Sequence, residues 1–299
     1  MKKITPVSVV SLLLLIAGWV LGVSQKDEKS NALLEQGKKV YHSHCAECHG
    51  PAGLGDGPKA HELGFHPRDF ALSAFKCRCT ASGELPTDED LLRTITNGMP
   101  GTPMRPFGSL SLHDRQALVQ FIKTLSPAFA AKPQPKCIGL APSIPMTEQT
   151  VHEGAQIYRV LNCWMCHGLQ GRGDGPSSAD LKDDWGRPIK AYNFTAGKRF
   201  KCGGDDPDLY RTMLTGMNGS PMPSYAEAML FAGDSVTDFS PFKKAYGAGE
   251  EEKLAQYLRG EPTASALKEL SPAARQALME KRAWALIHYL KSLVAGSAK

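Results

Sequence analysis

Two short stretches of this chain place cysteines and a histidine at a spacing that can attach a metalloporphyrin. They read Cys45-Ala-Glu-Cys48-His49 and Cys163-Trp-Met-Cys166-His167, and a glycine follows each. Two cysteines three residues apart lie on one face of a helix, where their thiols can form thioethers with the two vinyl groups of one porphyrin. The adjacent histidine can then coordinate the iron. A zinc or redox site would explain one such stretch, but two copies in matching contexts predict two covalently bound haem c groups.

These motifs belong to an internal repeat that covers most of the chain. The run His49–Pro58 matches His167–Pro176 at an offset of 118 residues. Residues 117–125 match residues 285–293 at an offset of 168. The halves are therefore duplicated domains. The larger second offset places about 50 extra residues in the second half, at roughly 226–275.

A methionine at one matched position in each half can supply the second axial ligand of the iron. Met104 and Met222 both lie 55 residues after the motif histidine, and each follows a proline that stiffens an extended loop. A thioether opposite histidine raises the potential of a haem, which suits an electron carrier. Met99 and Met217 also recur, but each adjoins the glycine that ends a predicted helix. We therefore expect the metal ligands to be His49 with Met104 and His167 with Met222.

Apolar spacing and capping residues predict the helices that position these groups. One helix leads into each haem motif, near residues 30–46 in the first half and up to Leu161 in the second. A second helix starts at Thr87, where Thr-x-x-Asp resembles a capping box, and ends at Gly98. Its counterpart starts around Asp206-Pro207 and ends at Gly216, and the closing helices start at Ser111 and around Ser271-Pro272.

On these residues each half resembles a class I cytochrome c domain, and the whole chain resembles the two-domain dihaem cytochromes c. The resemblance implies an all-α fold of two tandem class I-like domains after an N-terminal signal or anchor helix, with covalent haem, His/Met ligation and electron transfer. The expected boundaries are 1–24 for a signal peptide or membrane anchor, 30–126 for domain 1, 127–147 for a proline-rich linker, and 148–299 for domain 2 with its insertion at about 226–275.

The resemblance also implies two kinds of contact around each haem. In this family the first and last helices cross, and the motif histidine donates its other ring nitrogen to a backbone carbonyl, often that of a proline. Candidate acceptors are Pro58 and Pro176, or Pro67 in the first half. Candidate crossing residues are Gly37, Tyr41 and Phe121 in the first half and Gly154, Tyr158 and Tyr289 in the second.

The N-terminus predicts export of the chain. Two lysines precede an apolar run from Ile4 to Val23, which is either a cleaved signal peptide or a retained membrane anchor. Lysines on the cytoplasmic side place the remaining chain in the periplasm or on the outer face of the cytoplasmic membrane. The formal charge of +5 falls to +3 without Lys2 and Lys3. Haem propionates lower it further, so we expect no nucleic-acid partner.

Four cysteines lie outside the haem motifs, and an even number in an exported protein favours disulfides. Cys77 and Cys79 are too close for an easy mutual bridge. Four cysteines allow three pairings, and our working hypothesis pairs Cys79 with Cys137 of the linker and leaves Cys77 and Cys202, which end matching Phe-Lys-Cys runs, to each other or free. The alternative to a disulfide is that Cys77 or Cys202 provides an axial thiolate to a haem iron. The remaining histidines do not recur and are expected on the surface or in the core: His42, His44, His61, His66, His113, His152 and His288.

Three functions fit these features. The first is an electron-transfer protein, not itself an enzyme, that serves redox protein partners outside the cytoplasmic membrane. The second is a dihaem redox enzyme of the peroxidase or thiosulfate-oxidising type, which a methionine in each half disfavours. The third is a subunit of a quinol-oxidising or terminal-oxidase complex in the respiratory membrane. Aromatic residues of the insertion would then form either a docking surface or a local core: Phe231, Phe239, Phe242 and Tyr246.

Overall fold

The computed structural model describes residues 28–63, 66–133, 135–197, 200–236, 238–247 and 249–296. The predicted signal or anchor segment, 1–24, lies outside these residues. Within them the structure is helical, and the only β-type pairings are two isolated bridges, Thr80 with Cys137 and Lys182 with Pro188. The all-α fold class is confirmed. None of the helices in the described ranges combines the length and apolarity needed to cross a membrane.

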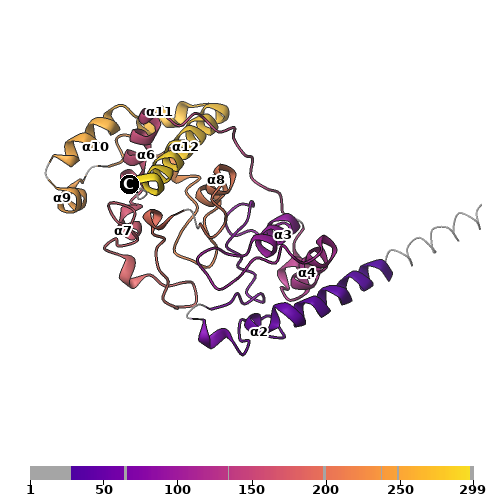
Figure 1. The fold of residues 1–299 in the computed structure, drawn as a ribbon. Coiled ribbons are helices and arrows are strands. Elements are labelled where there is room, and N and C mark those ends of the chain that lie inside the picture. Colours follow the sequence, from indigo (N-terminus) through magenta and orange to yellow (C-terminus); the bar gives the residue numbers. More distant parts are fainter. Residues whose placement is uncertain are drawn as a thin grey trace, which may run out of the picture. The chain divides into compact units, whose positions relative to one another are not determined.

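The first of two compact units comprises the described residues up to Ser73 and Phe107–Ala131. A helix over residues 28–44, drawn in indigo in Figure 1, leads into α2. This helix crosses α4 at Gly37, where a Cβ atom would overlap the carbonyl oxygen of Ala117. Tyr41 is fully buried, with its ring 5.1 Å from that of Phe121. The other elements of unit 1 are α2 (Ala46–His49), η1 (Ala60–Glu62), α4 (Leu112–Thr124) and α5 (Ala128–Ala131).

Unit 2 comprises residues 74–106 and the described residues from 132 onward. It therefore contains a segment of the first repeat, 74–106, together with the whole second repeat. The predicted domain boundaries remain a prediction. Its elements are α3 (Asp88–Asn97), α6 (Glu148–Val160), α7 (Trp164–His167), η2 (Ser178–Asp180), η3 (Phe194–Ala196), α8 (Asp206–Thr215), η4 (Ala228–Leu230), α9 (Ser240–Tyr246), α10 (Glu250–Arg259), α11 (Ala264–Glu269) and α12 (Pro272–Gly296).

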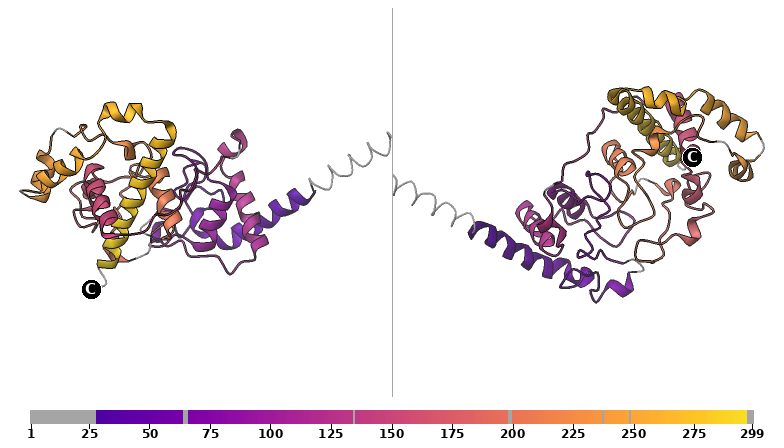
Figure 2. Two further views of the ribbon diagram at one scale, coloured as in Figure 1. Left: turned by 90° about the horizontal axis from the view of Figure 1, so that it is seen from above. Right: turned by 180° about the vertical axis from the view of Figure 1, so that it is seen from behind.

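The core of unit 2 forms where α6 and α12 cross, as Figures 1 and 2 show from different sides. At the crossing, a Cβ atom on Gly154 would overlap the carbonyl oxygen of Ala285. The Tyr158 ring lies 5.3 Å from that of Tyr289. The same glycine and aromatic positions thus bring the first and last helices together within each unit, as predicted from the resemblance.

The helix ends follow the capping signals of the sequence. Thr87 and Asp90 form a reciprocal capping box at the start of α3, and Gly98 follows its end at a φ of 66°. Gly216 follows α8 at the same φ of 66°. The Ser111 side chain accepts a hydrogen bond from the first turn of α4. The predicted helix starts and stops are therefore confirmed at these positions.

The insertion at 226–275 folds into η4 and the short helices α9, α10 and α11. Phe242 is buried with Leu254 and Leu258, and partly buried aromatic residues surround them. These partly buried residues include Phe231, Phe239 and Tyr246. Of the two interpretations of the insertion aromatics, the structure supports a local core.

Candidate haem sites

Each Cys-x-x-Cys-His motif forms a single helical turn that a glycine terminates. Gly50 after α2 and Gly168 after α7 have φ values of 78° and 82°. This backbone conformation strongly favours glycine, and a Cβ atom there would also overlap a side-chain oxygen of Asp56 or Asp174. Each motif therefore presents its two cysteines and its histidine within a single helical turn.

The glycine-rich runs after the motifs cap these turns with backbone amides. In unit 1 the Gly55 amide donates to the His49 carbonyl at 2.9 Å, and the Gly57 amide donates to the Cys48 carbonyl at 3.2 Å. In unit 2 Gly173 and Gly175 donate likewise to His167 at 2.7 Å and to Cys166 at 3.2 Å. These bonds satisfy carbonyls that a short helix leaves free at its end, so the runs hold the motif turns in place.

Hydrogen bonds orient both motif histidines. Nδ1 of His49 lies 3.1 Å from the carbonyl oxygen of Arg68, and Nδ1 of His167 lies 2.9 Å from that of Tyr192. A carbonyl only accepts, so Nδ1 carries the proton in each ring and the Nε2 lone pair remains for a metal. The predicted carbonyl acceptors, Pro58, Pro176 and Pro67, are wrong. The loop turns so that the residue after Pro67, and its counterpart in the other half, presents the carbonyl.

A phenylalanine packs on each motif histidine. The ring centroids of His49 and Phe70 are 4.9 Å apart and nearly parallel, at 16°. His167 and Phe194 are 4.7 Å apart at 31°. Burial lowers the pKa of both histidines, which favours the neutral imidazole that metals bind. Sequence reasoning missed these phenylalanines, although their recurrence at an offset of 124 residues is a signal that could have found them.

In unit 2 a partly open pocket brings together a cysteine, the histidine and the methionine predicted for the second haem. Cys163, His167 and Met222 all line it. Met217, the rival methionine, is not among the lining residues, whereas Met213 of α8 is. Sequence reasoning missed Met213 because its repeat counterpart is Ile95. The rest of the lining is apolar or aromatic: Tyr158, Phe194, Tyr225, Leu286 and Leu290.

These lining groups suit a covalently attached haem. Thiol, imidazole and thioether are the three side-chain types that attach and ligate a c-type haem iron. The apolar remainder suits the porphyrin plane. Burial raises the pKa of the Cys163 thiol to about 12, so it stays protonated at neutral pH.

The predicted residues of the first haem site fall in both units. Cys48 and His49 lie on α2 of unit 1, and Cys45 is the N-cap residue of this helix. Met104 lies in the loop after α3, which belongs to unit 2. Its pairing with His49 therefore remains a prediction from the repeat.

The other four cysteines form two disulfides, Cys77 with Cys202 and Cys79 with Cys137. The hypothesis that Cys79 pairs with Cys137 is confirmed. Cys77 and Cys202 pair with each other, so neither sulfur provides an axial thiolate. The four motif cysteines lie outside both bridges, as haem attachment needs.

The histidines outside the motifs lie on the surface or in the core, as expected. His288 is buried in α12, with Nδ1 2.8 Å from the Thr150 hydroxyl. The His42 ring packs against the Tyr41 and Phe121 rings. In the part of the chain that the structure describes, no cluster of three or more His, Cys, Asp or Glu side chains could hold a further metal ion.

Comparisons with known proteins agree with this geometry. Residues 32–122 match the family described as "Cytochrome C oxidase, cbb3-type, subunit III", and residues 151–238 match the family described as "Cytochrome c". Curated protein sequences gave no match. Among solved structures, the chain is similar to one from the "Kuenenia stuttgartiensis reducing HAO-like protein complex Kustc0457/Kustc0458". The two share 37% sequence identity with a TM-score of 0.68, over 87% of this chain and 96% of that one.

Proposed function

Because this chain belongs to the cytochromes c and carries two such domains, we propose that it transfers single electrons through two covalently bound haem c groups. Cys45 and Cys48 attach the first haem, and Cys163 and Cys166 attach the second. The axial ligands are His49 with Met104 and His167 with Met222. Haem iron that alternates between its ferric and ferrous states supplies the one-electron chemistry.

The pocket of unit 2 is the observation that carries this proposal. It gathers one thiol, one imidazole with a free Nε2, and the two thioethers of Met213 and Met222 among apolar side chains. An iron with protein ligands on both sides has no open position for a substrate, which favours electron transfer over catalysis. The 118-residue repeat extends the same ligand set to the first half.

The partners we propose are redox proteins in a complex outside the cytoplasmic membrane. The similarity to a chain of a "reducing HAO-like protein complex" supports an assembly of this kind. Cytochrome c domains work on the outer side of the membrane, which agrees with the export segment expected at the N-terminus. In such a complex this chain would supply or remove electrons while its partner performs the catalysis.

The visible spectrum of the oxidised holoprotein tests the ligation. We expect two equivalents of the absorption band that arises from methionine sulfur bound to ferric iron. Met104→Ala and Met222→Ala should each remove one equivalent. Met213→Leu is the matched control, because Met213 lines the same pocket and the proposal gives it no ligand role.

One outcome would contradict an electron carrier, and another would contradict only the assignment of Met222 as a ligand. One equivalent in the unsubstituted protein, or a high-spin signal, would indicate an open iron and favour the dihaem enzyme. Loss of an equivalent in Met213→Leu, with Met222→Ala unchanged, would transfer the ligand role to Met213.

A further inference from the structure

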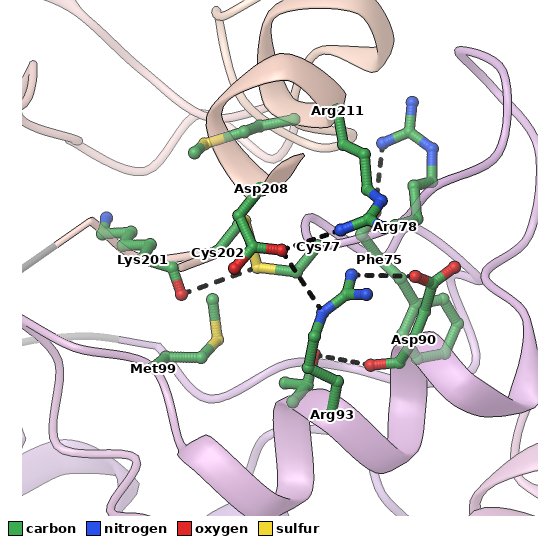
Figure 3. The surroundings of a disulfide bond; sticks show 12 residues. Phe75, Cys77, Arg78, Asp90, Arg93, Met99, Lys201, Cys202, Asp208 and Arg211 are labelled. Atoms are coloured by element: carbon green, nitrogen blue, oxygen red, sulfur yellow. Dashed lines mark hydrogen bonds and ion pairs between the residues drawn. A yellow bond between two sulfur atoms is a disulfide. The ribbon is translucent and has the colours of Figure 1, made fainter. Parts of the chain in front are cut away.

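A segment of the first repeat contacts the loop that carries Met222. This brace segment, residues 77–84, lies in unit 2 together with α8 and the loop 216–222. The Cys77–Cys202 disulfide joins it to the residues before α8, as Figure 3 shows. The Cys79–Cys137 disulfide joins it to the chain ahead of α6. Two covalent bonds thus fix this segment within unit 2.

Arg78, between the two cysteines, donates hydrogen bonds to the end of α8. Its side chain is buried, with 2% exposure. Nη2 donates to the Thr215 carbonyl at 2.6 Å, and Nη1 donates to the Gly216 carbonyl at 3.3 Å. Its remaining bonds go to nearby backbone carbonyls, that of Phe75 just before the brace segment at 3.4 Å and that of Ala81 within it at 3.3 Å.

These bonds suit the chemistry of a helix end. The last carbonyls of α8 carry the negative end of the helix dipole and lack partners within the helix. A planar guanidinium can bind two such oxygens at once, and the positive charge strengthens each bond. Burial lowers the pKa of Arg78 to about 10, so the side chain still carries its charge at neutral pH.

A second contact lies within the loop itself. The Asn218 side chain accepts from the Gly83 amide at 3.2 Å and donates to the Glu84 carbonyl at 3.3 Å. Asn218 therefore pairs with the backbone of the brace segment through both atoms of its amide. Together with Arg78, these bonds hold residues 215, 216 and 218, which immediately precede Met222.

The second repeat cannot form the same contacts with the methionine loop of the first repeat. Gly203 occupies the position that matches Arg78, and Pro100 occupies the position that matches Asn218. Gly203 has a φ of 104°, and a Cβ atom there would overlap the Asp208 carboxylate, so no larger side chain fits. Proline carries no side-chain amide. Within the described residues, the contacts of Arg78 and Asn218 thus join the first repeat to the second methionine loop, and the matching positions Gly203 and Pro100 do not supply the reciprocal contacts.

We propose that Arg78 and the brace segment position the Met222 loop, so that they hold the methionine ligand on the second haem and not that on the first. This inference rests on the ligation by Met222 proposed above. Arg78 is a positioning residue, because it acts through the backbone of residues 215 and 216. Met222 would dissociate from the iron more readily without it.

The test uses the full-length holoprotein in two backgrounds that each retain one methionine ligand. Arg78→Gln is combined with Met104→Ala, which leaves Met222, and separately with Met222→Ala, which leaves Met104. The readout is the midpoint of an alkaline titration, that is, the pH at which half of the methionine-to-iron band is lost as the pH is raised. In the Met104→Ala background we expect Arg78→Gln to lower this midpoint by about one pH unit, a tenfold weaker hold on the ligand, as loss of charge-assisted hydrogen bonds implies.

Matched variants complete the design. In the Met222→Ala background we expect no shift. Arg78→Lys, which keeps the charge, should recover part of the shift. Arg275→Gln is a control for the loss of an arginine bound to a helix carbonyl, since Arg275 donates to the Leu267 carbonyl of unit 2 at 3.2 Å. This bond lies outside the Met222 loop, so the midpoint should not change. Asn218→Ala should give a smaller shift of the same sign, and it serves as the test if Arg78→Gln fails to incorporate the second haem.

The outcomes separate the two proposals. An unsubstituted protein without two equivalents of the band would refute the ligation, and with it the premise of the brace. Two equivalents, with equal shifts in both backgrounds or no shift in either, would refute the positioning role alone.

Discussion

The two methionine loops have the same internal structure and different external support. In residues 98–104 the Met99 amide donates to the Met104 carbonyl at 2.9 Å, and in residues 216–222 the Met217 amide donates to the Met222 carbonyl at 3.0 Å. The Thr102 hydroxyl donates to the Met99 carbonyl, and the Ser220 hydroxyl donates to the Met217 carbonyl, both at 2.7 Å. Only the second loop receives the bonds of Arg78 and pairs through Asn218.

This difference distinguishes the hydrogen bonds that a duplication preserves from those that form only as the two halves diverge. Bonds inside a loop depend on local residues, so duplication preserves them. Bonds from a distant segment depend on which residues the rest of the chain brings near, and here Arg78 and Gly203 have diverged. Two sites with the same ligands can therefore differ in how firmly the protein holds one ligand. The following predictions test this comparison, from the largest expected effect to the smallest.

Removal of the thiols that we propose as the haem attachment points should have the largest effect. Cys45→Ser/Cys48→Ser and Cys163→Ser/Cys166→Ser should each reduce the haem content from two per chain to one, measured as the pyridine haemochrome per protein. The Cys45→Ser/Cys48→Ser variant should keep the band of Met222, because the bonds that support its loop lie within unit 2. Loss of that band would show that the second site depends on the first haem.

Removal of the disulfides should lower the stability of unit 2. We expect Cys77→Ser/Cys202→Ser to reduce the free energy of unfolding by about 2–4 kcal/mol, measured by denaturant titration followed by circular dichroism. Cys79→Ser/Cys137→Ser is the comparison. Because that bridge spans 58 residues rather than 125, the loss should be slightly smaller. Equal stability of the unsubstituted protein and the first variant would contradict a role for the bridge in securing the brace segment.

Alanine at the helix-crossing glycines should destabilise both units alike. Gly37→Ala and Gly154→Ala each insert a methyl group against a backbone carbonyl of the closing helix. Overpacking of this kind costs about 1–3 kcal/mol. The thermal midpoint of each variant gives the measurement. A large effect in only one unit would mean that the crossings, unlike the loops' internal bonds, are not equivalent.

Loss of the tyrosine hydroxyls should have the smallest effect. Tyr41 donates to the Gly50 carbonyl at 2.8 Å, and Tyr158 donates to the Gly168 carbonyl at 2.7 Å. Tyr41→Phe and Tyr158→Phe should each lower the free energy of unfolding by about 0.5–1.5 kcal/mol, the net value of one hydrogen bond. Denaturant titration should give similar values for the two, and a twofold difference or more would break the equivalence.

The repeat made much of this structure predictable. Paired positions identified the motif histidines and, with the capping signals at Thr87 and Gly98, the helices of each half. The repeat also related Cys77 to Cys202, which left Cys79 and Cys137 as the other pair of the working hypothesis. Apolar spacing and caps act over a few residues, so they leave a direct pattern in the sequence.

The remaining features depend on how distant segments meet. The histidine acceptors were misassigned because the offset changes from 118 to 124 between the motif and the acceptor loop, and because a carbonyl acceptor needs no particular side chain. Arg78 gives no signal either, since a guanidinium that binds backbone oxygens has no partner residue type to search for. Met213 was missed because only the second repeat has a methionine at that position.

The brace segment precedes the loop that it supports in the sequence, and this order has a consequence for how the chain matures. A ribosome makes residues 77–84 well before residues 202–222, because 125 residues separate the two cysteines of the first bridge. Cys77 can therefore form its native bridge only after Cys202 has been synthesised, whereas Cys79 can pair earlier with Cys137, 58 residues after it. Native pairing at Cys77 is thus a late event in biogenesis, and a chain truncated before Cys202 would leave this thiol free for wrong pairing with the haem-attachment cysteines.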